Sequence, residues 1–93
     1  MFVANQTQTI QQGLIRRIGK KDKSAVNECI AAYGNFVWAL ARKFTATSEE
    51  AEAASEEIFA DIWRYASRTD IIVTPDDQIV SLIARRRLFK YLL

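Results

Sequence analysis

The side chains that most often perform acid–base, nucleophilic or metal chemistry are scarce in this chain. Histidine is absent and Cys29 is the sole cysteine. Without histidine the commonest general base is missing, Ser–His and Cys–His pairs cannot form, and a zinc site would lack its usual ligands. Cys29 cannot close an internal disulfide, and its place beside an apolar seam favours a small buried side chain. We expect no enzyme activity and no metal or other cofactor.

Acidic side chains are the first of two charged groups that could recognise a partner. Six acidic residues and no basic one lie between Glu49 and Asp61. Residues three and four apart are neighbours on a helix surface, so several of these carboxylates gather along one side. One interpretation is a solvated acidic face whose first glutamates favour the helix N-terminus. The other is a docking face for a basic partner helix.

Basic side chains near position 90 form the second charged group. Four basic residues and no acidic one lie between Arg85 and Lys90. Arg86 and Lys90 share a helix face, and with Arg85 or Arg87 beside them they can meet phosphates on one surface. Such contacts give an affinity that falls steeply with salt. The alternative is a basic helix end that complements its own dipole.

Length and composition place these groups in a single helical domain. The 93 residues can bury one core, and 49% hydrophobic with 26% charged residues is typical of a globular protein. Three glycines and one proline are too few for the many turns of a sandwich or barrel. Residues 1–12 lack the features of a signal peptide, and no apolar run approaches the ~20 residues of a membrane helix. We expect a cytoplasmic protein without membrane insertion.

The first half of the chain is expected to form a short helix and a long one. The short amphipathic helix covers about 7–18, with Gly19 as its C-terminal cap, and Asp22 caps the long helix. Gly34 within the long helix indicates a close helix crossing. The apolar seam of this helix, which Phe36, Trp38 and Ala41 widen, places it at the centre of the bundle; the seam consists of Val26, Ile30, Tyr33, Val37, Leu40 and Phe44.

Two further helices are expected in the second half. Thr47 and Glu50 form a capping box that begins the third helix, and 67–73 is expected to be a loop. Thr74 caps the fourth helix and Pro75 occupies its first turn. The interior positions of the third helix are Ala51, Ser55, Ile58, Ile62 and Ala66, and those of the fourth are Ile79, Val80, Ile83, Ala84, Leu88 and Tyr91. The predicted fold is all-α, a compact bundle of one short and three longer helices.

Several motifs occur in a fixed order along nearly the whole chain. They are Leu14-Ile15, Gly19-Lys20-Lys21-Asp22 with Ala25, Tyr33-Gly34, Ala39-Leu40-Ala41, Glu50-Ala51-Glu52 followed by Glu56-Glu57-Ile58-Phe59 and Trp63, and Ile83-Ala84-Arg85. Together they resemble region 2 of the extracytoplasmic-function sigma factors, which direct bacterial RNA polymerase to promoters. The residues that depart from the family pattern are Ala53 for aspartate, Glu56 for glutamine, Ile79 for tryptophan, Arg86 for asparagine and Lys90 for aspartate.

The resemblance implies two partners and assigns a surface to each. The third helix would bind the clamp helices of the largest subunit of core RNA polymerase, through Glu49, Glu52, Ala53, Glu56 and Glu57. The fourth helix and the loop before it would hold the non-template single strand of the promoter minus-ten element, with one base flipped out of the stack. The residues expected at this DNA surface are Tyr65, Asp70, Thr74, Asp76, Ile79, Arg85, Arg86 and Lys90.

Several of these side chains also have an ordinary structural interpretation. Asp70, Thr74 and Asp76 offer polar groups to a flipped base, but turn and capping chemistry explains them equally well. Tyr65 is the best candidate for an exposed stacking platform, whereas most of the other aromatic residues at helical spacing, such as Phe59 and Trp63, are expected in the core.

The resemblance also implies a larger protein and a regulator. The chain stops at Leu93 without a helix cap, so we expect it to be a piece of a longer protein with a second, helix-turn-helix domain. An anti-sigma factor is the expected regulator. The leading alternative is a helical protein-interaction module with no role in DNA binding. A helix-turn-helix repressor ranks third, because the fourth helix lacks the tight turn that this motif needs.

Overall fold

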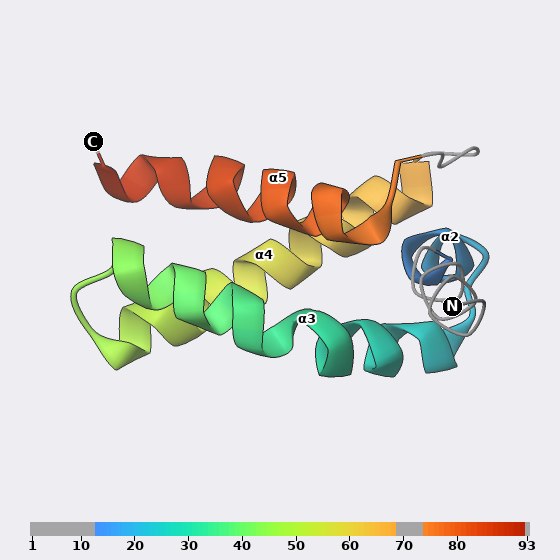
Figure 1. The fold of residues 1–93 in the computed structure, drawn as a ribbon, viewed down its shortest axis with the longest axis horizontal. Helices are drawn as coiled ribbons and strands as arrows, with labels where there is room; N and C mark the ends of the chain where they lie inside the picture. The colour runs from blue at the N-terminus through green and yellow to red at the C-terminus, as the bar shows by residue number, and fades with distance from the viewer. Residues whose placement is uncertain (1–12, 69–73, 93) are drawn as a thin grey trace, which may run out of the picture.

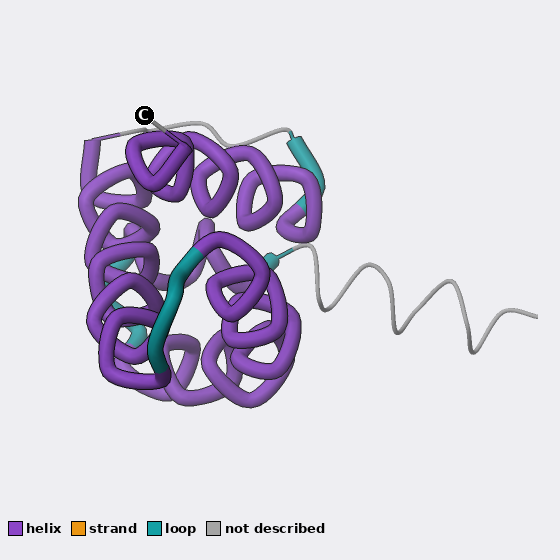
Figure 2. Tube along the Cα trace, turned by 90° about the vertical axis from the view of Figure 1, so that its left-hand side faces the viewer, coloured by secondary structure: helices purple, strands orange, loops and turns teal. Residues whose placement is uncertain are grey.

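The computed structural model describes residues 13–68 and 74–92, and this part of the chain is helical without strands. Its helices are α2 (Leu14–Gly19), α3 (Lys23–Phe44), α4 (Ser48–Arg68) and α5 (Asp76–Leu88), followed by the 3-10 turn η1 (Phe89–Leu92). The three long helices run side by side, and α2 packs where α3 begins and α4 ends (Figure 1). A view from one end shows the helices around a common centre (Figure 2). The predicted helical bundle is confirmed for these residues; positions 7–12 of the predicted first helix lie outside them.

The short helix α2 lies close to α4 because Gly19 has no side chain. A Cβ atom on Gly19 would lie 2.5 Å from the carbonyl oxygen of Ala66, closer than real Cβ contacts allow. Lys20 is the C-cap of α2, and the next residue, Lys21, has a left-handed backbone conformation with φ 66°. The prediction that Gly19 caps the helix is therefore corrected: its absent side chain permits a helix contact.

The long helix α3 begins as predicted and turns most of its predicted seam to the core, with Val37 buried and the others except Ile30 partly buried. The Ser24 amide donates to the Asp22 carboxylate at 3.0 Å, which confirms Asp22 as the N-cap. The buried side chains are the small or medium ones, Ala25, Cys29, Val37 and Ala41. Because these let neighbouring helices approach closely, the larger residues beside them remain partly outside the contact.

The large hydrophobic residues of α3 show the consequence. Phe36 and Trp38 are 41% and 38% exposed, so the expectation that they widen the seam is wrong, whereas Ala41 is fully buried as expected. Ile30, placed in the seam itself, is 45% exposed and is also corrected. The Arg42 guanidinium lies over the Trp38 ring, 5.7 Å from its centroid, a cation–π contact at the surface. A Cβ atom on Gly34 would meet only an Ile30 methyl, at an ordinary contact distance of 3.9 Å, so the prediction of a close helix crossing at Gly34 is wrong.

Helix α4 follows its sequence pattern closely. The Glu50 amide donates to the Thr47 hydroxyl at 3.1 Å, and the Glu50 carboxylate accepts from the Ala46 amide at 2.8 Å. The predicted cap is confirmed, with the reciprocal bond one residue earlier than in a standard capping box. The residues buried on its inner face are Ala51, Ala54, Ile58, Ile62 and Ala66, so the predicted interior set is corrected at one position, where Ala54 is buried and Ser55 only partly so. Each buried isoleucine contributes roughly 1.5–3 kcal/mol, so this face anchors the bundle.

Helix α5 starts one residue later than expected. Pro75 is the N-cap and makes no side-chain cap bond, and Thr74 is exposed, so the prediction that Thr74 caps the helix is wrong. The inward face is as predicted, since Ile79, Val80, Ala84 and Leu88 are buried and Ile83 is partly buried against them. The α-helix ends at Leu88, before the predicted interior position Tyr91, which is partly buried in η1. Because this face of α5 is buried in the core, only the opposite side of the helix can contact other molecules.

Candidate nucleic-acid interface

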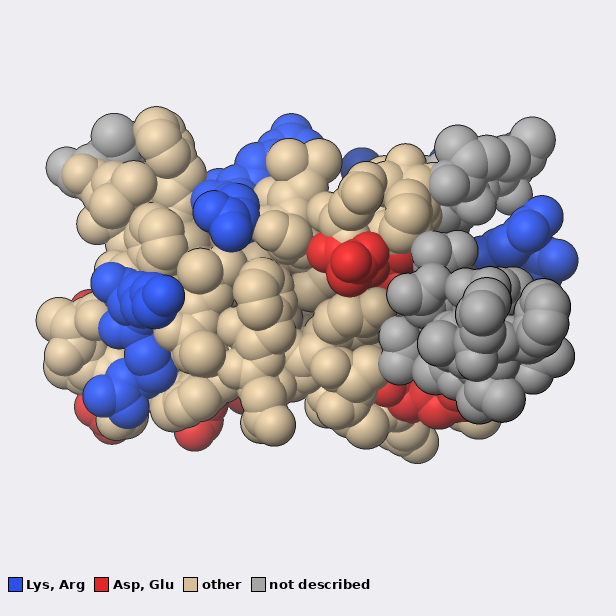
Figure 3. All heavy atoms as spheres, viewed as in Figure 1, with Lys and Arg blue, Asp and Glu red and all other residues tan. Residues whose placement is uncertain are grey.

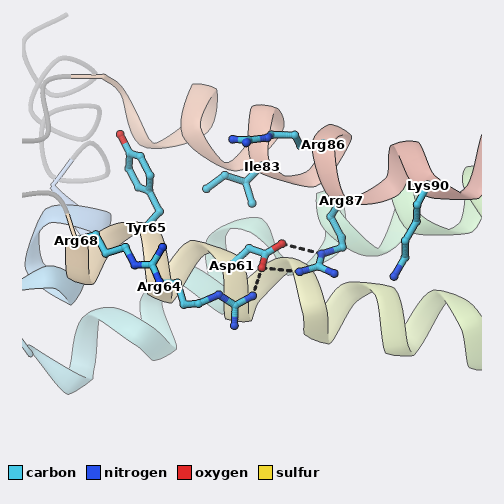
Figure 4. A pocket seen from close by; sticks show the side chains of 8 residues that line it. All are labelled: Asp61, Arg64, Tyr65, Arg68, Ile83, Arg86, Arg87 and Lys90. Carbon is cyan, nitrogen blue, oxygen red and sulfur yellow. Dashed lines mark hydrogen bonds and ion pairs between the residues drawn. The ribbon is translucent and has the colours of Figure 1, made fainter.

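A partly buried ion pair joins α4 to α5. Arg87 donates from Nε to Oδ2 and from Nη2 to Oδ1 of Asp61, both at 2.7 Å, and Arg64 also donates to Asp61 (Figure 4). These bonds, the Arg87 bond foremost, lower the pKa of Asp61 below its usual range. Two parallel bonds fix the guanidinium as well as neutralise it. Arg87 thus holds the two helices together and is not available as a free phosphate ligand.

A second, more exposed ion pair joins η1, which follows α5, to α4. Lys90 Nζ donates to Glu57 Oε1 at 3.2 Å, and Arg87 Nη1 lies 4.0 Å from the same oxygen. Both Lys90 and Glu57 are about half exposed, at 49% and 41%, so this pair contributes at most about 1 kcal/mol. One residue expected to bind polymerase therefore pairs with one expected to bind DNA.

Beside these pairs, α4 and α5 enclose an open hollow of about 480 Å³. It is lined by Asp61, Arg64, Tyr65, Arg68, Ile83, Arg86, Arg87 and Lys90 (Figure 4). Five of these side chains are basic and one is acidic, and a ring and an aliphatic chain lie between them. Basic side chains also show over α5 in the space-filling view (Figure 3). Such a lining suits a polyanion with flat apolar parts.

A second hollow, of about 610 Å³, shares Tyr65, Ile83 and Arg86 with the first. Its further lining residues include Thr74 and Arg85. The expected DNA-binding residues that line one hollow or the other are Tyr65, Thr74, Ile79, Arg85, Arg86 and Lys90. Ile79 is 4% exposed, so it belongs mainly to the core. The structure therefore gathers most of the expected DNA surface in one place; Asp70 lies outside the described residues.

Asp76 has a different role from the one expected. Its side chain is fully buried, and its Oδ2 and Oδ1 accept from the amides of Leu14 at 3.0 Å and Ile15 at 3.2 Å. Burial raises the pKa of Asp76, against the lowering effect of these two bonds. Gly13, the N-cap of α2, has no side chain to cap it, and Asp76 supplies the missing acceptor. The prediction that Asp76 offers a polar group to DNA is corrected.

The expected polymerase-binding residues divide between two sides of α4. Glu49, Glu52, Ala53 and Glu56 are exposed, and at 100° per residue they fall within about 100° of the helix circumference. We call these four residues the acidic stripe. Glu57 lies about 80° round from Glu49, on the side that meets α5. The stripe makes no ion pair with any residue in 13–68 or 74–92.

Sequence reasoning missed Arg64 and Arg68 in the last turns of α4. They lie four residues apart on either side of Tyr65, a spacing that puts two cations on one helix face beside an aromatic ring. That spacing could have been recognised in the sequence. The packing of α5 against this face could not, because it depends on contacts between distant segments. Asp61 was likewise counted in the acidic run without its Arg87 partner.

The described residues hold no group of three side chains placed to bind a metal ion. Within the same residues, no helix is long and apolar enough to cross a membrane. Burial raises the pKa of the Cys29 thiol to about 12, so this cysteine is a poor nucleophile.

Comparisons with protein-family models, with curated proteins and with solved structures give no match. Function must therefore be inferred from the two charged surfaces and from the motifs of the chain itself.

Proposed function

We propose that the chain is a transcription initiation domain of the sigma region 2 type. It is a cytoplasmic, non-enzymatic adaptor that binds core RNA polymerase through the acidic stripe and promoter single strand through the hollows between α4 and α5. The observation that carries the proposal is the separation of charge around α4. The stripe and the basic hollow lie about a third of a turn apart on this one helix.

The DNA side of the proposal is supported by the convergence of the residues expected at the DNA surface. Tyr65 of α4, Arg85 and Arg86 of α5, and Lys90 of η1 line adjoining hollows. Separating and extruding a base costs a few kcal/mol, which stacking and phosphate contacts can offset without hydrolysis. A half-buried aromatic ring among guanidinium groups supplies both kinds of contact.

The polymerase side is supported by exposure and charge. Glu49, Glu52 and Glu56 face solvent on one helix side, and Ala53 among them is small enough for a partner backbone to approach. A basic helix of a coiled-coil clamp would complement this stripe. An anti-sigma factor would inhibit by covering the stripe, the hollows or both.

Retention by purified bacterial core RNA polymerase tests the proposal. The parent should be retained by the immobilised polymerase, and a Glu52→Lys, Glu56→Lys variant should not be retained. A control with Asn27→Lys and Asn35→Lys adds two lysines at exposed positions of α3 and should be retained like the parent. Circular dichroism on each variant checks that the fold is kept.

Failure of the folded parent to bind would overturn the proposal. The helical interaction module without a DNA role would then be the better account. Equal loss of both lysine variants would also count against it, because a general charge effect would replace a defined docking surface.

A further inference from the structure

The outward side of α3 carries little charge for a helix at the surface of a small domain. The thirteen residues from Cys29 to Ala41 include no charged side chain. Seven of them are exposed, and Asn35 is the single polar one among the seven; the others are Ile30, Ala31, Ala32, Phe36, Trp38 and Ala39. A surface helix normally turns charged or polar residues to solvent, and a contiguous exposed apolar face indicates a contact with a partner.

Small side chains form the centre of this face and aromatic side chains form its two edges. At 100° per residue, Ala32, Asn35 and Ala39 fall within about 60° of the helix circumference. Phe36 lies on one side of them and Trp38 on the other, and these rings are 41% and 38% exposed. Alanine lets two helix axes approach to the lower end of the usual spacing of about 8–10 Å, with the rings on either side of the partner. The face therefore fits a second helix.

The two ends of this face carry charges of opposite sign. Glu28 lies near the start of α3 and Lys43 near its end; both are exposed and in line with Ala32 and Ala39. Glu28 accepts from Arg17 and is still 46% exposed, and Lys43 forms no ion pair with any residue in 13–68 or 74–92. The surface over the middle of α3 is uncharged between acidic side chains near its start and basic ones near its end (Figure 3). Such a face is complementary to itself when one copy is turned end for end.

We propose that this face of α3 pairs with a second copy of the chain in an antiparallel dimer with two-fold symmetry. Ala32 of each copy then lies opposite Ala39 of the other, and Glu28 lies opposite Lys43, because both pairs of positions have the same midpoint, next to Asn35. A two-fold contact uses the same surface on both subunits, so each pair occurs twice. A parallel dimer would instead set like charges against each other at both ends.

The dimer is independent of the proposed function. The acidic stripe belongs to α4, and neither of the two hollows is lined by α3. A variant that loses the dimer should therefore still be retained by core polymerase. An anionic membrane surface would match this face less well than a second copy, because Glu28 would meet headgroups of like charge.

Disulfide trapping of the full chain tests the direction of the pair. Asn35→Cys puts a thiol beside the two-fold axis, where its counterpart in the second copy lies within reach of a disulfide. Asn27→Cys, the control, puts a thiol at another exposed position of α3, about 25 Å from its counterpart in the antiparallel pair. Cys29 is fully buried and does not interfere. Mild oxidation should give covalent dimers of Asn35→Cys and not of Asn27→Cys.

Sedimentation equilibrium of the full chain tests the contact itself. The parent should show a reversible monomer–dimer equilibrium that weakens as salt rises, because salt screens exposed ion pairs. Lys43→Glu should raise the dimer dissociation constant about tenfold, since it sets two carboxylates against each other at both ends of the face. The control Lys20→Glu makes the same charge change at an exposed position after α2 and should alter the constant by less than about twofold. Circular dichroism checks that each variant is folded.

A parent that stays monomeric up to about 1 mM would overturn the dimer. Covalent dimers formed equally by the two cysteine variants would also overturn it, because a parallel pair or random collision would link both. Equal effects of Lys43→Glu and Lys20→Glu would remove the contact from this face. A monomeric parent that sediments with vesicles of phosphatidylglycerol and phosphatidylcholine, and no longer does so as Phe36→Ser, would assign the face to a membrane instead.

Discussion

The carboxylates of α4 lie in two regions of the helix surface that differ in what they contact. Glu49, Glu52 and Glu56 face solvent and pair with no described residue, whereas Asp61 binds Arg87 of α5 and Glu57 binds Lys90 of η1. In the sequence all five stand in one acidic run. The helix angle, 100° per residue, decides whether a carboxylate serves an external partner or the fold. A run of charged residues in the sequence therefore does not by itself define one binding surface; the neighbouring elements decide which of its side chains are exposed.

Asp76 extends this comparison to a carboxylate that serves only the fold. It is fully buried and accepts two amide bonds from α2. The comparison predicts that substitutions will cost most stability at Asp76, less at Asp61 and almost none in the acidic stripe.

Asp76→Ala should give the largest loss of stability, about 3 kcal/mol in the free energy of unfolding. It leaves the amides of Leu14 and Ile15 buried without an acceptor, at about 1–3 kcal/mol for each group. Urea denaturation measures the change, with Asp77→Ala, at an exposed position in the same turn, as the control. Similar costs for the two variants would show that the Asp76 bonds do not anchor α2.

Asp61→Asn should lower stability by about 1–2 kcal/mol and at the same time strengthen single-strand binding. The variant loses the ionised acceptor of Arg87, and hydrogen bonds to charged groups contribute about 1.5–3 kcal/mol when fully formed. Affinity should rise about fivefold at 0.1 M salt, as for one added phosphate contact, because Arg64 and Arg87 are no longer compensated. Denaturation and the anisotropy of a fluorescein-labelled single-stranded oligonucleotide, measured on one preparation, check both; weaker DNA binding would contradict the role given to Asp61.

The pH dependence of stability should have opposite signs at the two aspartates. Arg87 lowers the pKa of Asp61 below its ordinary 3.8, so the stabilisation is complete above that value and is lost as pH falls toward the folded-state pKa. Burial raises the pKa of Asp76 above 3.8, so its ionisation costs stability as pH rises from that value through the folded-state pKa. The measurement is the urea midpoint as a function of pH in the acid range, for the parent, Asp61→Asn and Asp76→Asn. Relative to the parent, the rise of the midpoint with pH should be shallower in Asp61→Asn and steeper in Asp76→Asn. Changes of the same sign would refute this assignment.

The Glu52→Lys, Glu56→Lys variant should change stability least, by under about 0.5 kcal/mol, because both positions are exposed and unpaired among the described residues. Thermal unfolding measures this, and the same preparation should fail to bind core polymerase. A large loss of stability would show that the stripe serves the fold after all.

Features that depend on contacts within one element were predictable from the sequence. The Asp22 cap, the Thr47 cap and the inward faces of α4 and α5 all follow from residues a few positions apart. The seam of α3 faces the core as predicted except at Ile30, but the periodic pattern did not show that small side chains, Ala25, Cys29 and Ala41, take the most buried positions.

Features that depend on distant segments were not predictable. Asp76 meets Leu14 and Ile15 across more than 60 positions, and Gly19 is required by a carbonyl of α4. The basic hollow needs α5 to lie along the last turns of α4, so Arg68 and Arg86 become neighbours only in the folded chain. The spacing of residues within either helix does not predict this packing between the two helices.

Amide chemical-shift mapping with a single-stranded oligonucleotide tests most directly whether the two charged regions are separate surfaces. We predict shifts at Tyr65, Arg68, Ile83 and Arg86, which weaken with salt, and none at Glu49, Glu52 or Glu56. Shifts spread over the acidic stripe, or absent from the basic hollow, would contradict the division of α4 into a polymerase side and a DNA side.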